Sequence, residues 1–169
     1  GAGVEGPKGG AGGTGGAGAK DGGPGAAATG PKISSRAQLL FEDALKSYEL
    51  MKKAKTFDYP SLEKKFQLAA DADSNFGEAD YDLGVLSERQ GKPEEAMRHY
   101  REALRKKPTL KEAAENIGVI AQNAGNEAEA IKTFENILQS YPEDGASRAR
   151  LADIYARKGN CEKAIELSK

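Results

Sequence analysis

A stretch of 34 residues is repeated almost three times in the second half of this chain. The first copy spans residues 77–110, the second spans 111–144, and a third starts at Gly145 and is cut off at Lys169. The pairs that match at this offset are Leu83 and Ile117, Gly84 and Gly118, Gly91 and Gly125, Ala96 and Ala130, Tyr100 and Phe134, Leu104 and Leu138, and Pro108 and Pro142. A fixed period of this length is typical of chains in which each copy is one small unit that stacks on the next.

The spacing inside each copy predicts two helices. With each copy numbered from its first residue, positions 7 and 10 are apolar at helical spacing, and positions 20 and 24 continue the pattern after a break. Position 15 is the glycine Gly91, Gly125 or Gly159, which suits a left-handed cap that ends the first helix. Positions 8 and 20 are small, and we expect Gly84 and Ala96 to face each other where the two helices come close.

On these residues the chain resembles the tetratricopeptide repeat (TPR) family. The resemblance is clear over 77–169 and faint over 34–76, and it implies an all-α solenoid of antiparallel helix pairs. It also has departures, because the aromatic residue that the family has at position 4 is Asp80, Ala114 and Arg148 here. Ile137 replaces the usual small residue at position 27.

Two further segments precede the clear copies. Residues 33–76 are predicted to form a degenerate repeat with a lengthened first helix capped by Ser34 or Ser35, a break at 56–60 and a second helix from Ser61. Terminal repeats are usually atypical, so this unit would start the stack. Residues 1–32 are almost half glycine and are predicted to be a disordered leader or tether, since such a composition buries little apolar surface. The solenoid is thus predicted over 33–169, with full repeats at 77–110 and 111–144 and a truncated one at 145–169.

The sequence offers little support for an enzyme or for a bound cofactor. The chain has one histidine, His99, and one cysteine, Cys161, with no ligand spacing typical of a metal site. Glycines at 1–6 and 13–18 fit a dinucleotide-binding spacing, but the strand and helix that this motif requires are not predicted around them. We therefore expect no catalysis, no cofactor and no metal.

The charge pattern argues against nucleic-acid and membrane binding. The formal net charge is −1, and a short basic run near Arg101 is interleaved with glutamates, as on a solvated helix face. No apolar run approaches the roughly 18 residues that a membrane-spanning helix needs.

The resemblance implies that the first helix of each repeat lines a concave groove that receives a peptide or a helix of a partner protein. The predicted partner-binding residues are Glu78, Tyr81, Asp82, Val85, Glu112, Glu115, Asn116, Val119, Arg150 and Asp153. For each of them, an ordinary solvated face is the alternative interpretation.

The predicted groove does not match the family's clamp for a terminal carboxylate. Asn116 and Arg150 occupy clamp positions with the expected residue types, whereas Tyr81, Val85 and Ala146 do not. The groove is acidic over 77–123 and mixed over 146–157, which favours a ligand with basic and apolar character.

The function predicted from the sequence is a non-enzymatic protein-interaction scaffold. The composition of the leader is similar to that of bacterial cell-envelope proteins, which indicates a multiprotein assembly of the cell-envelope or motility type. That would place the protein in the periplasm or at the outer membrane, with the cytoplasm as the other possibility. The alternative function is a repeat segment of a larger enzyme or machine whose catalytic domains lie outside these residues.

Overall fold

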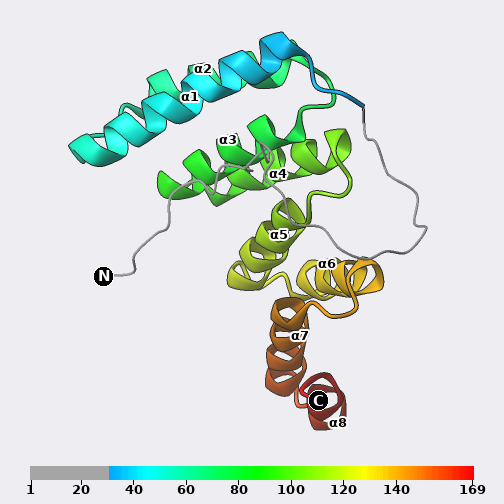
Figure 1. Ribbon diagram of the computed structural model, residues 1–169. Coiled ribbons are helices and arrows are strands. Elements are labelled where there is room, and N and C mark those ends of the chain that lie inside the picture. Colours follow the sequence, from blue (N-terminus) through cyan, green and yellow to red (C-terminus); the bar gives the residue numbers. More distant parts are fainter. Residues whose placement is uncertain (1–30) are drawn as a thin grey trace.

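The computed structural model of this chain describes residues 31–169, and in that range it consists of helices and short connections with no strand. The helices are α1 (Ser35–Ala54), α2 (Tyr59–Ala72), α3 (Gly77–Arg89), α4 (Pro93–Lys106), α5 (Lys111–Asn123), α6 (Glu127–Ser140), α7 (Gly145–Arg157) and α8 (Cys161–Leu167) (Figure 1). The all-α architecture predicted from the repeat is confirmed. Residues 1–30, which hold most of the predicted disordered leader, lie outside the described part.

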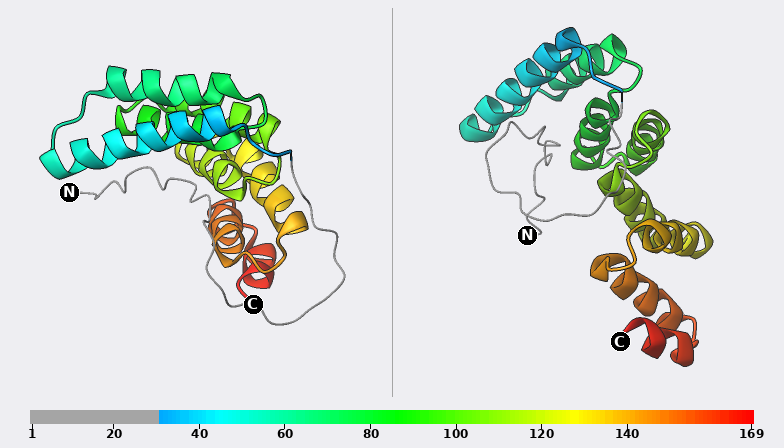
Figure 2. Two further views of the ribbon diagram at one scale, coloured as in Figure 1. Left: turned by 45° about the horizontal axis from the view of Figure 1, so that its top comes forward. Right: turned by 45° about the vertical axis from the view of Figure 1, so that its right-hand side comes forward.

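The helices form consecutive pairs that stack along the chain. Each helix packs against the next one, from α1 with α2 through to α7 with α8. Figure 1 shows α3, α5 and α7 along one side of the stack and α4, α6 and α8 along the other. Figure 2 shows the same order of pairs from two further directions, with α1 and α2 at one end and α8 at the other. The first helices of the repeats therefore share one side, which is the side on which the sequence places its candidate residues.

The glycine at position 15 ends the first helix of each clear repeat, as predicted. Gly91, Gly125 and Gly159 have φ angles of +72°, +77° and +77°, in the left-handed region that favours glycine. Among the described residues, none comes within 4 Å of a Cβ built at these three positions. The backbone conformation alone therefore requires glycine there.

The glycine at position 8 has a different neighbour from the one expected. A Cβ built on Gly84 would lie 2.5 Å from Cε1 of Tyr100, and one built on Gly118 would lie 2.7 Å from Cε1 of Phe134. The three atoms nearest to a Cβ at Gly84 thus all belong to Tyr100, which was not the neighbour predicted from the sequence. The aromatic ring at position 24, rather than the alanine at position 20, fills the space that the missing side chain leaves.

Side-chain caps mark the starts of both helices in the first pair. The side chain of Ser34 accepts a hydrogen bond from the backbone N–H of Ala37 and caps α1. Helix α2 begins at Tyr59, two residues before the predicted start at Ser61, and the side chain of Asp58 caps it. Pro60 was expected to lie in the break between the two helices, but it lies in the first turn of α2. In that turn the backbone N–H groups have no partner within the helix, so a proline costs no hydrogen bond.

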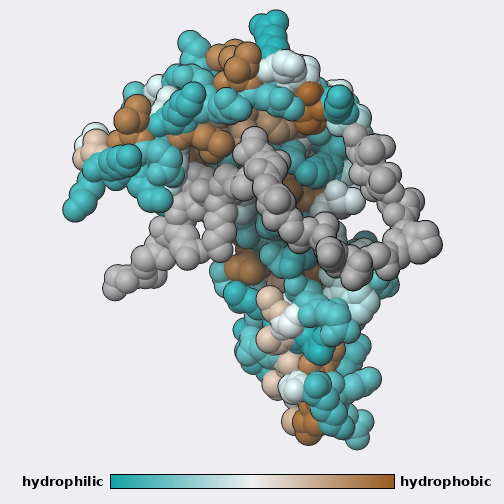
Figure 3. Space-filling view, viewed as in Figure 1, coloured by the Kyte–Doolittle hydropathy of each residue, from teal (hydrophilic) through white to brown (hydrophobic). Residues whose placement is uncertain are grey.

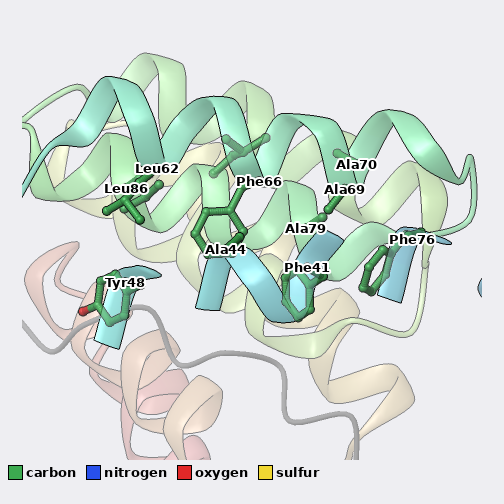
Figure 4. Packing of buried hydrophobic residues seen from close by; sticks show 12 residues of the cluster. Phe41, Ala44, Tyr48, Leu62, Phe66, Ala69, Ala70, Phe76, Ala79 and Leu86 are labelled. Carbon is green, nitrogen blue, oxygen red and sulfur yellow. The ribbon is translucent and has the colours of Figure 1, made fainter. Parts of the chain in front are cut away.

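The first helix pair packs against α3 through an aromatic cluster. The ring of Phe41 in α1 lies 5.7 Å from that of Phe66 in α2 and 4.8 Å from that of Phe76, just before α3 (Figure 4). Leu83 and Leu86 of α3 belong to the same buried cluster. On the surface shown in Figure 3, apolar residues are scattered among hydrophilic ones.

Candidate partner-binding face

The residues predicted to bind a partner lie on α3, α5 and α7, and we call this set of helices the first-helix face. On α3, residues 78, 82, 85 and 89 follow a spacing of three to four residues and so share one side of the helix. We call Glu78, Asp82, Val85 and Arg89 the α3 stripe. Tyr81 lies beside this stripe, on the side of α3 that packs toward α4 and α5.

Three of the predicted residues on α3 are buried. Tyr81 is 6% exposed, Asp82 is 0% exposed and Val85 is 7% exposed. Tyr81 packs its ring 5.6 Å from the ring of Tyr100, and Val85 joins the same apolar cluster as Ile117. These two side chains contribute to the core between α3, α4 and α5.

The carboxyl group of Asp82 is an unusual member of the α3 stripe. Neither of its oxygens has a hydrogen-bond partner among residues 31–169. Burial raises the pKa of Asp82 well above its usual range, and the neighbouring carboxylate of Glu78 raises it further. The α3 stripe thus holds a buried acid whose ionised form is strongly disfavoured.

Glu78 and Asp80 secure α3 to α4 through lysines. The carboxylate of Glu78 forms an ion pair with Lys107, while its Oε2 atom is buried and accepts no hydrogen bond from the described residues. Asp80 stands where the family has an aromatic residue, and its Oδ2 lies 2.7 Å from Nζ of Lys106. Burial raises the pKa of Asp80 although Lys106 opposes the rise. The aspartate that replaces the family's aromatic residue at position 4 therefore forms an ion pair in which both side chains are nearly buried.

Arg89 joins the end of the α3 stripe to the first helix pair. Its guanidinium carbon lies 5.4 Å from the ring centre of Tyr48 in α1 and 5.3 Å from that of Phe57. A cation over two aromatic rings is a favourable contact. The position of Tyr48 places α1 next to the α3 stripe.

The predicted residues of α5 are more accessible than those of α3. Glu112 is exposed, whereas Glu115, Asn116 and Val119 are partly buried. Glu115 Oε1 lies 2.9 Å from Nζ of Lys111. Asn116 interacts with the hydroxyl group of Tyr81. Burial raises the pKa of Tyr81 to about 12, with hydrogen bonding to Asn116 opposing the rise.

On α7, the predicted residues belong to a hydrogen-bonded surface network. Arg150 Nη1 donates to Gln122 Oε1 over 3.4 Å, and Gln122 Nε2 donates to Asp153 Oδ2 over 3.0 Å. Arg157 lies 3.1 Å from the same carboxylate. Arg150 and Asp153 are exposed. Sequence spacing placed these residues on one side, but it gave no sign that Gln122 links α5 to α7.

Other residues in the described range give little support to catalysis or metal binding. His99 is partly buried, and burial lowers its pKa. Cys161 is exposed. Over residues 31–169, the structure contains no group of three or more potential ligands placed to hold a metal ion. In the same range no helix is long and apolar enough to cross a membrane.

A hollow between three of the helices was not predicted. It lies between α4, α5 and α6 and has a volume of about 310 Å³. Apolar side chains such as Leu104, Ile117 and Ile137 line much of it, and Lys111 and Tyr141 lie at its edge. Lys111 also forms an ion pair with Asp144, with 2.6 Å between Nζ and Oδ1.

Comparisons with known proteins point to one family. Two tetratricopeptide repeat family models match the chain, one over residues 81–110 and one over 121–167. Among curated proteins, none matches the chain significantly in sequence.

Several solved structures share the fold. A crystal structure of MamA superposes with a TM-score of 0.65 at 15% identity, covering 78% of this chain and 73% of its own. A MamA structure from Desulfovibrio magneticus RS-1 gives 0.65 at 17% identity, covering 80% and 73%. YrrB, described as a TPR protein with an unusual peptide-binding site, gives 0.59 at 23% identity, covering 78% of this chain and 64% of its own. At these identities the likeness establishes the arrangement of helices.

Proposed function

We propose that this chain, which matches tetratricopeptide repeat models over residues 81–110 and 121–167, is a protein-interaction scaffold that binds a peptide or a helix of a partner protein along the first-helix face. The residues proposed to contact the partner are Glu78, Tyr81, Asp82, Val85, Glu112, Glu115, Asn116, Val119, Arg150 and Asp153. Tyr81 and Val85 would act chiefly by supporting this surface, because their side chains pack in the apolar core between α3, α4 and α5.

The observation that carries the proposal is the chemistry of this face. Buried polar groups in proteins are nearly always hydrogen-bonded, because an unsatisfied one loses its water without compensation. Here the α3 stripe holds buried carboxylate oxygens that the described residues leave without a partner. In the next two repeats, α5 and α7 present accessible amide, guanidinium and carboxylate groups. Such a surface supports hydrogen bonding to an extended backbone and pairing with basic side chains.

The proposal extends to the setting in which the scaffold works. A multiprotein assembly of the bacterial cell-envelope or motility type is favoured by the composition of the Gly-rich leader, which is similar to that of tethered envelope proteins. Fractionation of the cells that make the protein, with antibody detection, tests this part independently of the binding face. Recovery only in the cytosolic fraction would contradict it.

A peptide selection tests the binding face. A displayed library of random dodecapeptides is selected against the immobilised chain, and the affinities of recovered peptides are measured by fluorescence anisotropy. Asn116→Ala is expected to weaken binding by about 1 kcal/mol, with a smaller loss for Arg150→Ala. The control is Arg101→Ala on α4, whose exposed side chain pairs with Glu129. A larger loss for Arg101→Ala than for Asn116→Ala would move the binding surface to the second helices and refute the proposal.

A further inference from the structure

A group of buried oxygen atoms that lack hydrogen-bond partners among residues 31–169 lies in the α3 stripe and on α1. Within the described chain, Oδ1 and Oδ2 of Asp82, Oε2 of Glu78 and Oη of Tyr48 are all buried and unbonded. We call these four atoms the unsatisfied acceptors. Glu78 and Asp82 lie one turn apart on α3, and their carboxylates repel each other. Tyr48 projects from α1, where burial raises the pKa of its hydroxyl and the carboxylates of Glu49 and Asp82 add to the rise.

The nearby cations are engaged by other groups. Lys106 pairs with Asp80, and Lys107 pairs with Glu78 through the other oxygen of that carboxylate. Arg89 lies over the rings of Tyr48 and Phe57. Asp82 is therefore a fully buried carboxyl group that the described residues leave without an ion-pair partner, although Arg89, Lys106 and Lys107 lie on or next to α3 and α4. Ionising such a group away from water is unfavourable, and a cation of a bound partner would offset that cost.

Equivalent positions in the other repeats show that this acid is particular to one repeat. Position 6 is Asp82 on α3, Asn116 on α5 and Arg150 on α7. The amide of Asn116 and the guanidinium of Arg150 interact with neighbouring side chains. The repeat architecture thus accommodates a neutral or a basic residue here, and a buried acid is not required for folding the repeat.

We propose that Asp82, with Glu78, anchors one arginine side chain of the partner segment that binds the first-helix face. The acceptor atoms are covered in the unliganded chain, so the groups that cover them must move aside when the arginine binds. This inference rests on the proposed function and specifies the partner's chemistry. A guanidinium has five N–H donors, two of which match the two oxygens of one carboxylate in parallel. The remaining donors suit the other unsatisfied acceptors on Glu78 and Tyr48. An ammonium group has three donors and a stronger hydration shell, so lysine would satisfy fewer of these oxygens and be harder to desolvate.

Four peptide pools test the anchor on the full chain. Each pool is a random heptapeptide library with a fixed central residue, which is arginine, lysine, glutamine or citrulline. Citrulline has nearly the same shape as arginine but carries no charge. At pH 7 we expect the arginine pool to be retained at least tenfold more than the citrulline pool, with lysine between them. Asp82→Asn should reduce this preference to less than twofold.

Two further variants separate a specific anchor from general attraction. Glu94→Gln removes one negative charge from an exposed position on α4, outside the residues proposed to contact the partner, and it should leave the arginine preference intact. Glu78→Gln should lower the preference severalfold without altering Asp82. This second variant also keeps the proposal testable if Asp82→Asn does not fold, which circular dichroism would reveal.

The possible outcomes distinguish this inference from the proposed function. If all pools bind equally and Asn116→Ala weakens them all, the face binds peptides but the arginine anchor is refuted. If the arginine preference survives Asp82→Asn, or if Glu94→Gln removes it as well, attraction is diffuse and the anchor is again refuted. If no pool binds at micromolar peptide concentrations, both proposals fail together.

Discussion

Replacing Asp82 by asparagine should make the unliganded protein more stable, although most substitutions of fully buried residues have the opposite effect. Asparagine is nearly isosteric with aspartate, and it is the residue that the next repeat has at this position, Asn116. The substitution therefore preserves shape, removes the ability to ionise and replaces one oxygen with an NH2 group. The pH dependence of its effect on stability isolates the cost of burying the ionisable carboxyl group, because the amide does not titrate.

The magnitude of the effect has an upper limit that follows from proton binding. A buried acid that cannot ionise can always take up a proton instead, and this costs about 1.4 kcal/mol for each pH unit above its ordinary pKa of about 3.9. At pH 7 the penalty on folding is therefore at most about 4 kcal/mol. Residual interactions of Asp82 in the unfolded chain reduce this, so we expect Asp82→Asn to raise the free energy of unfolding by about 1–3 kcal/mol at pH 7.

The sign of the pH dependence follows from the raised pKa. Above the unfolded-state pKa, the folded protein binds more protons at this site than the unfolded chain does, so rising pH destabilises the fold. Below about pH 4 both states carry the protonated acid and the penalty disappears. The stability gained by Asp82→Asn should thus be close to zero near pH 4 and should increase toward pH 7. Glu78, Tyr48 and Tyr81 are the titratable groups that interact with Asp82, and the variant retains all three.

Urea denaturation followed by far-ultraviolet circular dichroism at several pH values between 4 and 8 measures this difference directly. The wild-type chain and Asp82→Asn are compared at each pH, with Glu112→Gln as a control at an exposed acid of the same face. The control should shift by less than about 0.5 kcal/mol at every pH. If Asp82→Asn lowers stability at pH 7, or if its effect is the same at all pH values, then Asp82 is satisfied in the folded protein and the arginine anchor loses its physical basis.

Two other predictions concern the packing and capping of the repeats. Gly84→Ala should destabilise the fold by about 1–3 kcal/mol, because the added Cβ would meet the fully buried ring of Tyr100 at 2.5 Å. Gly145→Ala has nothing described within 4 Å and should change stability by less than about 1 kcal/mol; equal losses for the two variants in urea denaturation would contradict the observed packing. Asp144 caps α7, and the ion pair with Lys111 and the N–H of Ser147 lower its pKa to about 2. Asp144→Ala should therefore cost about 1–2 kcal/mol above pH 4, and thermal melts should show this cost shrinking as the pH falls toward 2.

The features that could be predicted from the sequence are those encoded locally. The left-handed conformation of Gly91 follows from the residue type and its place after an apolar periodic run. The start of α1 after Ser34 follows from the capping preference of serine. The start of α2 was missed by two residues because Pro60 is compatible with both a break and a first helical turn.

Features that depend on contacts between distant residues could not be predicted in the same way. The repeat pattern showed that Gly84 must be small, but only the packing of α4 on α3 shows that the ring of Tyr100 occupies the space. Likewise, the register placed Asp82 on the first-helix face, but it could not show that its carboxyl group is fully buried. Helix spacing fixes the direction of a side chain, whereas its exposure depends on every segment that packs beside it.

The two ends of the first-helix face should therefore contribute differently to partner binding. On α5 and α7, Gln122, Arg150 and Asp153 already hydrogen-bond to one another, so a ligand gains little net energy by replacing those bonds. On α3, the unsatisfied acceptors have no such bonds within the described chain to give up, so a matching cation there gains new hydrogen bonds, less the cost of its own desolvation and of ionising Asp82. We expect the α3 end to supply most of the affinity. The α5–α7 end would set the direction in which the partner segment lies, because its polar groups discriminate among sequences at little energetic gain.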